Sequence, residues 1–207
     1  MLMNNYNPNI HHRHSIRLKG YDYSQAGLYF ITICVKDREC LFGEIIDGKM
    51  NLNDAGIMVE NEWLKITARF PNVQLHQYIV MPNHFHTIME ITAGATLVVD
   101  HDNSRDHDNN RTTTRVAPTV TVGGVIGAFQ SIVTVEYIRG VKNLGWQLFN
   151  GKLFQRNYYE HIIRNEQSYQ RISKYIINNP KNGRKIIFPT NKTIFLMSGK
   201  WFNKHEI

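Results

Sequence analysis

Two histidines, His84 and His86, stand one residue apart in the stretch MPNHFHTIMEI, directly after a Pro-Asn turn and at the start of an apolar run. Side chains alternate between the two faces of a β-strand, so both imidazoles should point to the same side. Two neighbouring imidazoles can reach one cation, and imidazole is a common ligand of transition metals. For an H-x-H pattern taken alone, two strand histidines that bind no metal remain the alternative.

The predicted strand around these histidines has two different faces. Ile88 and Glu90 share the histidine face, and the other face carries Phe85, Thr87, Met89 and Ile91. We expect the second face to pack on the protein core. The first face then presents its polar residues at one end of the strand, where a site can form.

The elements that must position this pair alternate irregularly along the chain. Hydrophobic periodicity and turn signals predict strands over 29–35, about 73–80 and about 85–91, and a hairpin of 40–46 and 49–52 around Asp47-Gly48. They also predict three helices. The first has Asp54 as N-cap and ends by Phe70-Pro71, the second begins at about Gly124, and the third covers 166–178 and stops at Pro180. Hairpin connections favour an α+β fold with a mainly antiparallel sheet and helices packed on one face.

The 207 residues are enough for about one domain, and composition divides the chain further. Residues 1–20 are basic and rich in Asn and His, and we expect a flexible arm. Residues 21–180 form the domain. Within it, residues 92–118 lack periodicity and aromatic residues and are expected to form a variable surface loop. Residues 181–207 form a basic C-terminal tail.

The net charge of +7 and the pI of about 9.4 favour anionic partners, with nucleic acid first. No apolar run is long enough to suggest a membrane span, so no membrane partner is expected. The two cysteines, Cys34 and Cys40, have no metal-type spacing and form no disulfide framework. This usage fits a reducing compartment, and we expect a cytoplasmic protein associated with the nucleoid.

The longer string YIVMPNHFH resembles the metal-site signature of the single-tyrosine HUH transposases, in which a hydrophobic residue, here Phe85, separates two histidines. The stretches VGGVIGAFQSIVTVEY and LFQRNYYEHIIRNEQSYQRISKYIINNP are similar to the REP-associated tyrosine transposase branch of that family. The resemblance covers about residues 21–180 and implies a ferredoxin-like, HUH-type fold. The ending after Pro180 departs from the tryptophan-containing ending of the family, and Gln130 stands where relatives carry a lysine.

By this resemblance, KYIINNP identifies Tyr175 as the nucleophile and Asn179 as the third metal ligand beside His84 and His86. Residues i and i+4 share one face of a helix, which is consistent with that pairing. Taken without the resemblance, Tyr175 borders a buried stripe and would be a residue at the edge of the core. His161, in YYEHIIR, is a further candidate for supporting the site.

The resemblance implies a transposase that cleaves and rejoins single-stranded DNA near hairpins through a covalent 5′-phosphotyrosine, with Mg²⁺ or Mn²⁺ as cofactor. Single-stranded or hairpin DNA is the expected partner, and a homodimer stays open. Cationic side chains would bind phosphates. The candidates are Arg139, Lys142, Lys152, Arg156, Arg164 and Arg171, with Arg13, Arg17 and Lys19 in the arm.

Two other functions remain open. A non-catalytic protein that binds DNA hairpins would use the same surface without cleavage. A metal hydrolase would use the histidine pair to activate a water molecule, and its activity would not need Tyr175.

Overall fold

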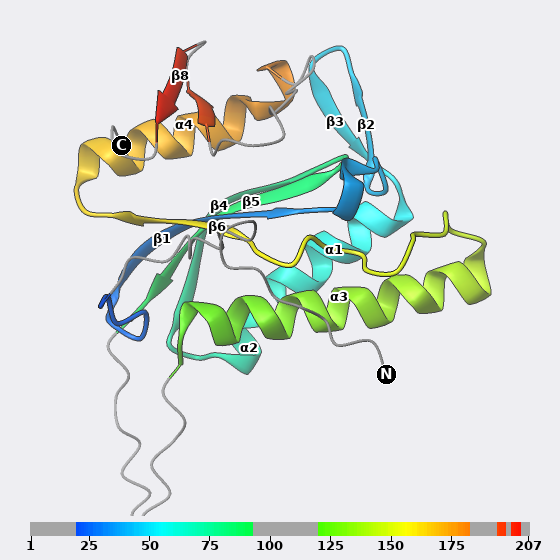
Figure 1. The fold of residues 1–207 in the computed structure, drawn as a ribbon, viewed down its shortest axis with the longest axis horizontal. Coiled ribbons are helices and arrows are strands. Elements are labelled where there is room, and N and C mark those ends of the chain that lie inside the picture. Colours follow the sequence, from blue (N-terminus) through cyan, green and yellow to red (C-terminus); the bar gives the residue numbers. More distant parts are fainter. Residues whose placement is uncertain (1–19, 93–119, 183–193, 198–199, 204–207) are drawn as a thin grey trace, which may run out of the picture.

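The computed structural model describes residues 20–92, 120–182, 194–197 and 200–203. Its centre is a four-stranded antiparallel sheet in the order β4-β5-β1-β6 (Figure 1). The strands are β1 (Gly27–Cys34), β4 (Val73–Met81), β5 (His84–Ile91) and β6 (Tyr159–Ile163). The expected α+β class with an antiparallel sheet is therefore confirmed.

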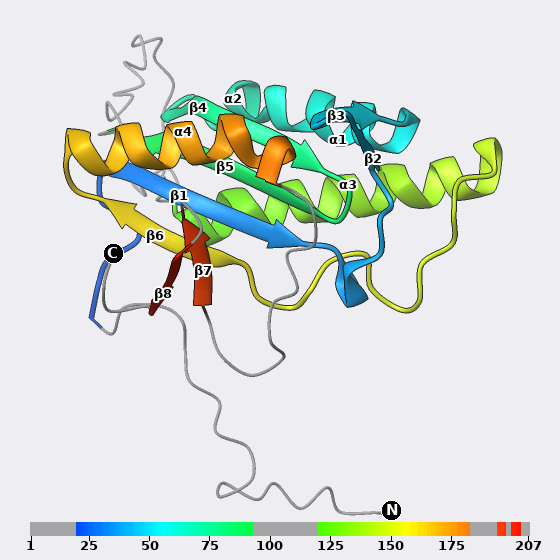
Figure 2. The same ribbon diagram turned by 90° about the horizontal axis from the view of Figure 1, so that it is seen from above.

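The remaining elements cover this sheet or extend from it (Figure 2). A small hairpin pairs β2 (Gly43–Ile46) with β3 (Lys49–Leu52), and β7 (Ile194–Met197) pairs with β8 (Lys200–Asn203). The helices are a 3₁₀ turn η1 (Lys36–Arg38), α1 (Asp54–Leu64), α2 (Ile66–Arg69), α3 (Val122–Leu144) and α4 (Glu166–Asn182).

Helices lie on both faces of the sheet. The expectation placed them on one face, and α1, α2 and α3 do share one face, whereas α4 crosses the other (Figure 1). The large core on the α1–α3 side includes Trp63, Phe85 and Phe129 in mutual ring contact. A second, smaller core lies under α4 and consists of Phe30, Ile88, Ile163, Ile172 and Ile176.

The alternation of β5 explains this division. Phe85 and Met89 point into the large core, as predicted, whereas Ile88 belongs to the smaller core under α4. His84 and His86 have the same parity as Ile88, so they face α4. The sheet thus separates a structural face from the face that carries the histidines.

Two predicted helix boundaries need correction. Asn53, not Asp54, is the N-cap of α1, because its side-chain oxygen accepts a hydrogen bond from Gly56 N at 2.9 Å. The last helix does not stop at Pro180 but continues to Asn182. Proline has a helix-compatible φ, and in this last turn it costs one hydrogen bond. The turn is supported by the β2–β3 loop, where a Cβ added to Gly48 would lie 3.6 Å from Lys181 Cα.

Several predictions fall outside the described residues. They concern the arm over residues 1–19, most of the loop over residues 92–118, and most of the C-terminal tail. The cationic candidates Arg13, Arg17 and Lys19 belong to this group. None of the helices in the described ranges is long and apolar enough to cross a membrane.

Candidate active site

The β4–β5 hairpin places the two histidines. Met81 pairs with His84 across the hairpin, and Pro82-Asn83 forms the turn between the strands. On the other side, His84 and His86 lie opposite Cys34 and Thr32 of β1. Both histidines are buried, with exposed fractions of 7% for His84 and 2% for His86.

His86 contacts residues of two elements, β1 and α4. Thr32 Oγ1 lies 2.8 Å from its Nδ1, and the Tyr175 hydroxyl lies 3.3 Å from its Nε2. Phe30 stacks on the ring, with centroids 5.5 Å apart. Both partners are hydroxyls, so these contacts are compatible with the tautomer in which Nδ1–H donates to Thr32 and Nε2 accepts from Tyr175, which is the tautomer whose Nε2 can bind a metal.

His84 is oriented by its neighbour in the turn. Its Nδ1 lies 2.7 Å from Asn83 Oδ1, and since an amide oxygen only accepts, Nδ1–H is the donor. The two imidazole centroids are 4.5 Å apart, at an interplanar angle of 74°. In both rings Nδ1 donates to a protein oxygen, and Nε2 keeps the lone pair that a metal ligand needs.

Burial keeps both imidazoles neutral. It lowers the pKa of His84 from 6.5 to about 4, and the nearby Arg38 guanidinium contributes to the shift. It also lowers the pKa of His86 well below 6.5, with a smaller effect from His84. Neutral imidazole is the form that binds metals, so the pair is ready to bind a cation at neutral pH.

Tyr175 reaches this pair from α4. Its ring meets Phe30 edge to face, with centroids 6.2 Å apart, and the His86 ring at 5.3 Å. Burial raises the pKa of the Tyr175 hydroxyl above 10, although the nearby Asn179 amide acts in the opposite direction. The hydroxyl is therefore protonated at neutral pH and fits the donor role toward His86 Nε2.

Asn179 lies one helical turn beyond Tyr175 and is 1% exposed. Neither its side-chain oxygen nor its nitrogen completes a well-formed hydrogen bond in the described part of the chain, although the amide lies close enough to the Tyr175 hydroxyl to lower its pKa. An unpaired buried amide is costly, and such groups occur where a ligand can complete them. Within the described ranges, no group of three or more His, Cys, Asp or Glu side chains is placed to hold a metal. Among the described residues, a third donor to this pair would then be of another type, such as the Asn179 amide oxygen.

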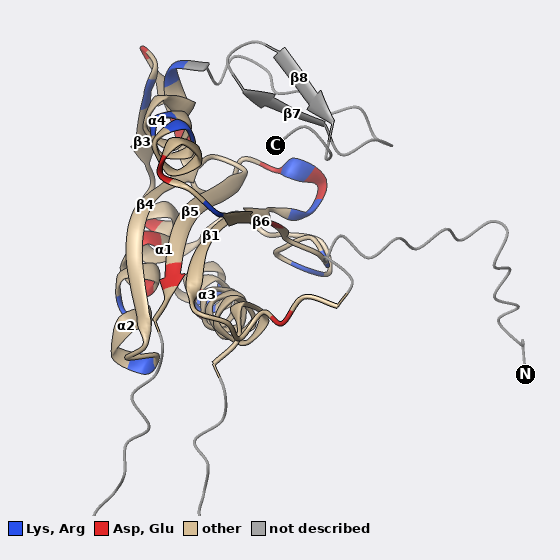
Figure 3. Cartoon of the chain, turned by 90° about the vertical axis from the view of Figure 1, so that its left-hand side faces the viewer, with Lys and Arg blue, Asp and Glu red and all other residues tan. Residues whose placement is uncertain are grey.

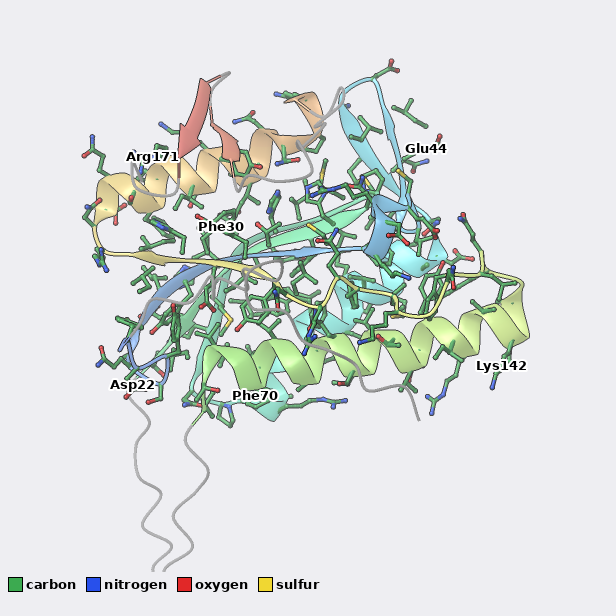
Figure 4. All side chains as sticks on the ribbon, in the orientation of Figure 1. Asp22, Phe30, Glu44, Phe70, Lys142 and Arg171 are labelled. Atoms are coloured by element: carbon green, nitrogen blue, oxygen red, sulfur yellow. The ribbon has the colours of Figure 1, made fainter. Side chains whose placement is uncertain are left out.

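The other predicted residues are scattered. His161 lies on β6 opposite Phe30, and burial followed by the charges of Arg164 and Arg171 lowers its pKa. Lys152 and Arg156 line a cavity next to the end of β1. Arg139 pairs with Glu136 on α3, and Lys142 lies toward the C-terminal end of that helix, far from Arg171 on α4 (Figure 4). The structure therefore does not gather the six candidate cations on one surface.

Three contributors were missed by sequence reasoning, namely Thr32, Asn83 and Arg38. Thr32 was detectable in principle, because it is the one polar residue within the apolar run YFITICV. Its partner lies 54 residues away, however, and pairing of β1 with β5 could not be read from either segment alone.

The chain matches none of the known family models. An uncharacterized protein of Haemophilus influenzae strain Rd is 43% identical to it over 178 residues, which cover 84% of this chain and 92% of that protein. This chain belongs to the family of that protein.

Two solved structures resemble this chain, and the first of them shares its fold. A REP-associated tyrosine transposase, determined with a REP hairpin bound, aligns with a TM-score of 0.51 and 17% identity over 81% of this chain and 74% of that chain. A candidate transposase from Deinococcus radiodurans R1 aligns with a TM-score of 0.40 and 17% identity over 78% of this chain and 95% of that chain.

Proposed function

We propose that this protein cleaves and rejoins single-stranded DNA, with Tyr175 as the nucleophile. The observation that carries the proposal is the 3.3 Å distance between the Tyr175 hydroxyl and His86 Nε2. It joins a potential nucleophile to a buried pair of neutral imidazoles, which are residues of the YIVMPNHFH and KYIINNP motifs. The fold shared with a transposase that was solved with a REP hairpin supports DNA as the substrate.

The residues fit a divalent cation. His84 and His86 each keep Nε2 as a donor, and the unpaired Asn179 amide has an oxygen to add. Two nitrogens and one oxygen suit Mn²⁺ at least as well as Mg²⁺, which prefers oxygen. When bound, the cation supplies positive charge that draws electron density from a phosphate oxygen.

The chain itself supplies the nucleophile and its orientation. The Tyr175 oxygen attacks phosphorus and loses its proton, while the bond to the 3′ oxygen breaks. That oxygen takes up a proton and leaves as a 3′-hydroxyl, and the 5′ end stays on Tyr175 as a phosphotyrosine. Since one phosphodiester is exchanged for another ester, rejoining needs no ATP. Phe30 positions both reacting rings, because it contacts His86 and Tyr175.

The proposal is tested with labelled single-stranded hairpin DNA, Mn²⁺ and the purified protein, separated on a denaturing gel. We expect a covalent DNA–protein band from the wild type and none from Tyr175→Phe. Tyr169→Phe is the matched control, because Tyr169 lies on the same helix and its hydroxyl contacts His76 instead. It should keep the band.

Other outcomes would identify the two alternatives. Cleavage that persists in Tyr175→Phe but is lost in His84→Ala would indicate a hydrolase with an activated water. Specific hairpin binding with no covalent band from the wild type would indicate a non-catalytic DNA-binding protein.

A further inference from the structure

A surface cavity of about 520 Å³, widely open to solvent, lies beside the end of β1. This volume is within the range of roughly 300–1,000 Å³ that is usual for ligand sites. Its lining contains four cationic side chains and one carboxylate, together with Phe154 and Gln155. The charged residues are Lys36, Asp37, Arg38, Lys152 and Arg156.

Two segments distant in sequence build the walls. Residues 153–155 run beside the end of β1, since Lys36 N donates to Leu153 O and Gln155 N donates to Cys34 O, both at 2.9 Å. An isolated bridge between Val35 and Phe154 joins them as well. The cavity is therefore supported by the backbone of the sheet.

The turn at η1 is held in an unusual conformation. Asp37 and Arg38 both have left-handed φ values, of 54° and 58°. Consecutive non-glycine residues in this region are strained, and such strain is common at functional sites. Lys36 is fixed by a 2.9 Å hydrogen bond from its Nζ to Asn150 O, which ties the turn to the opposite wall.

The same turn is connected to the histidine pair. Asn83 Nδ2 donates to Arg38 O at 3.3 Å, and Asn83 Oδ1 accepts from His84 Nδ1. Val35 N donates to Asn83 O at 2.9 Å. Cys34 pairs with His84 across the sheet, and Lys36 follows Cys34 by two residues. Two residues of extended chain span roughly 7 Å, so the start of the turn lies close to the histidine pair.

Two of the cavity's cations have no acidic partner among the described residues. Lys152 and Arg156 are exposed, and neither forms an ion pair among the residues that the structure describes. Asp37 is 3.6 Å from Lys36, so the one acid of the lining is already engaged. Elsewhere, cations are spread over separate elements such as α2 and α4 (Figure 3).

We infer that this cavity binds the sugar-phosphate backbone of an unpaired nucleotide next to the phosphate that Tyr175 attacks. This inference rests on the proposed function for its substrate, single-stranded DNA. Lys152 and Arg156 contact phosphate, and Lys36 and Arg38 hold the wall between this nucleotide and the histidine pair. The cavity thus sets which phosphate of the strand lies at Tyr175.

The test measures binding of a fluorescent single-stranded oligonucleotide by anisotropy, in chelator so that no cleavage occurs, at about 50–200 mM salt. For single strands, each lost phosphate contact lowers the slope of log K against log salt by about 0.7. We expect that decrease in Lys152→Ala and in Arg156→Ala, and about twice that decrease in the double variant. Arg69→Ala, an exposed arginine at the end of α2 outside the cavity lining, is the control and should keep the wild-type slope.

An unchanged slope in the double variant, or an equal decrease in Arg69→Ala, would overturn the inference. The covalent-band assay separates this result from the proposed function. If the inference holds, the double variant needs more DNA for half-maximal band formation but reaches the wild-type yield at saturation. If wild type forms no band, the proposed chemistry fails, while the salt slopes still decide whether the cavity binds DNA.

Discussion

The Tyr175 hydroxyl lies 3.3 Å from His86 Nε2, the atom whose lone pair a metal ion would use. The same nitrogen cannot accept this hydrogen bond and coordinate a cation at once. Tyr175 and the cation therefore compete in the resting protein. The effect of Tyr175 on metal affinity can therefore be measured without DNA, independently of its proposed role in cleavage.

We expect Tyr175→Phe to bind Mn²⁺ more tightly by roughly 2- to 10-fold, because a net hydrogen bond of about 0.5–1.5 kcal/mol no longer has to be broken. Isothermal titration calorimetry without DNA measures the change. Tyr169→Phe should bind as the wild type does. Weaker binding by Tyr175→Phe would mean instead that the hydroxyl helps to hold the ion.

Thr32 should control metal affinity without touching the metal. Its Oγ1 lies 2.8 Å from His86 Nδ1 and can accept from Nδ1–H, which favours the tautomer that leaves the Nε2 lone pair for a metal. Loss of such a partner commonly lowers metal affinity by about 10- to 100-fold, and we expect this for Thr32→Val. Thr134→Val on α3 removes a hydroxyl that bonds to Gln130 O and serves as the control. Equal affinities of the two variants for Mn²⁺ would contradict the prediction.

The buried Asn179 amide should lower the free energy of unfolding of the metal-free protein. The residue is 1% exposed and its amide interacts only with the Tyr175 hydroxyl, without completing a well-formed hydrogen bond among the described residues, and an unsatisfied buried polar group costs about 1–3 kcal/mol. We expect Asn179→Leu to raise the free energy of unfolding by a similar amount in urea titrations with chelator, and to abolish the covalent band. Asn178→Ala, which only removes a bond to Lys174 O, should not stabilise the protein. A destabilised Asn179→Leu protein would show that the amide has a structural role.

The buried histidines should make stability depend on pH. The pKa of His84 is about 4 in the folded protein and 6.5 as the reference for the unfolded chain. The unfolded state therefore binds more protons between these values, so stability is full above about pH 6.5 and falls as the pH decreases toward 4. The loss from His84 is at most about 3 kcal/mol.

Urea titrations in chelator at about pH 7 and pH 5 measure this dependence. His84→Gln should lose less stability than the wild type over that interval, because it removes one group that must be protonated on unfolding. Equal losses in the two proteins would show that His84 does not stay neutral in the folded state.

The sequence predicted most of what lies close together along the chain. The strands on either side of Met81-Pro82-Asn83 and the shared face of His84 and His86 follow from period-two alternation, and the β2–β3 hairpin follows from Asp47-Gly48. The motif predicted Tyr175 as the nucleophile, which stays a prediction, and its approach to His86 required the structure.

Long-range pairing explains what could not be predicted. β6 was not recognised as a strand, because YEHII mixes a carboxylate and a histidine with its apolar residues. Its pairing with β1 places α4 on the second face of the sheet, and this position brings Tyr175 to the histidines. Helix α4 also continues past Pro180, because packing of its last turn outweighs the local preference to stop.

Because the sheet has a core on each face, the residues of the two central strands have two separate roles. In β1 and β5, one set of alternate residues fills the large core under α1–α3, and the other set builds the face toward α4. A substitution on one face therefore affects the side chains of the other face only through the backbone that they share. The chemistry of the histidine face can therefore change over evolution while the architecture is maintained by the residues in between.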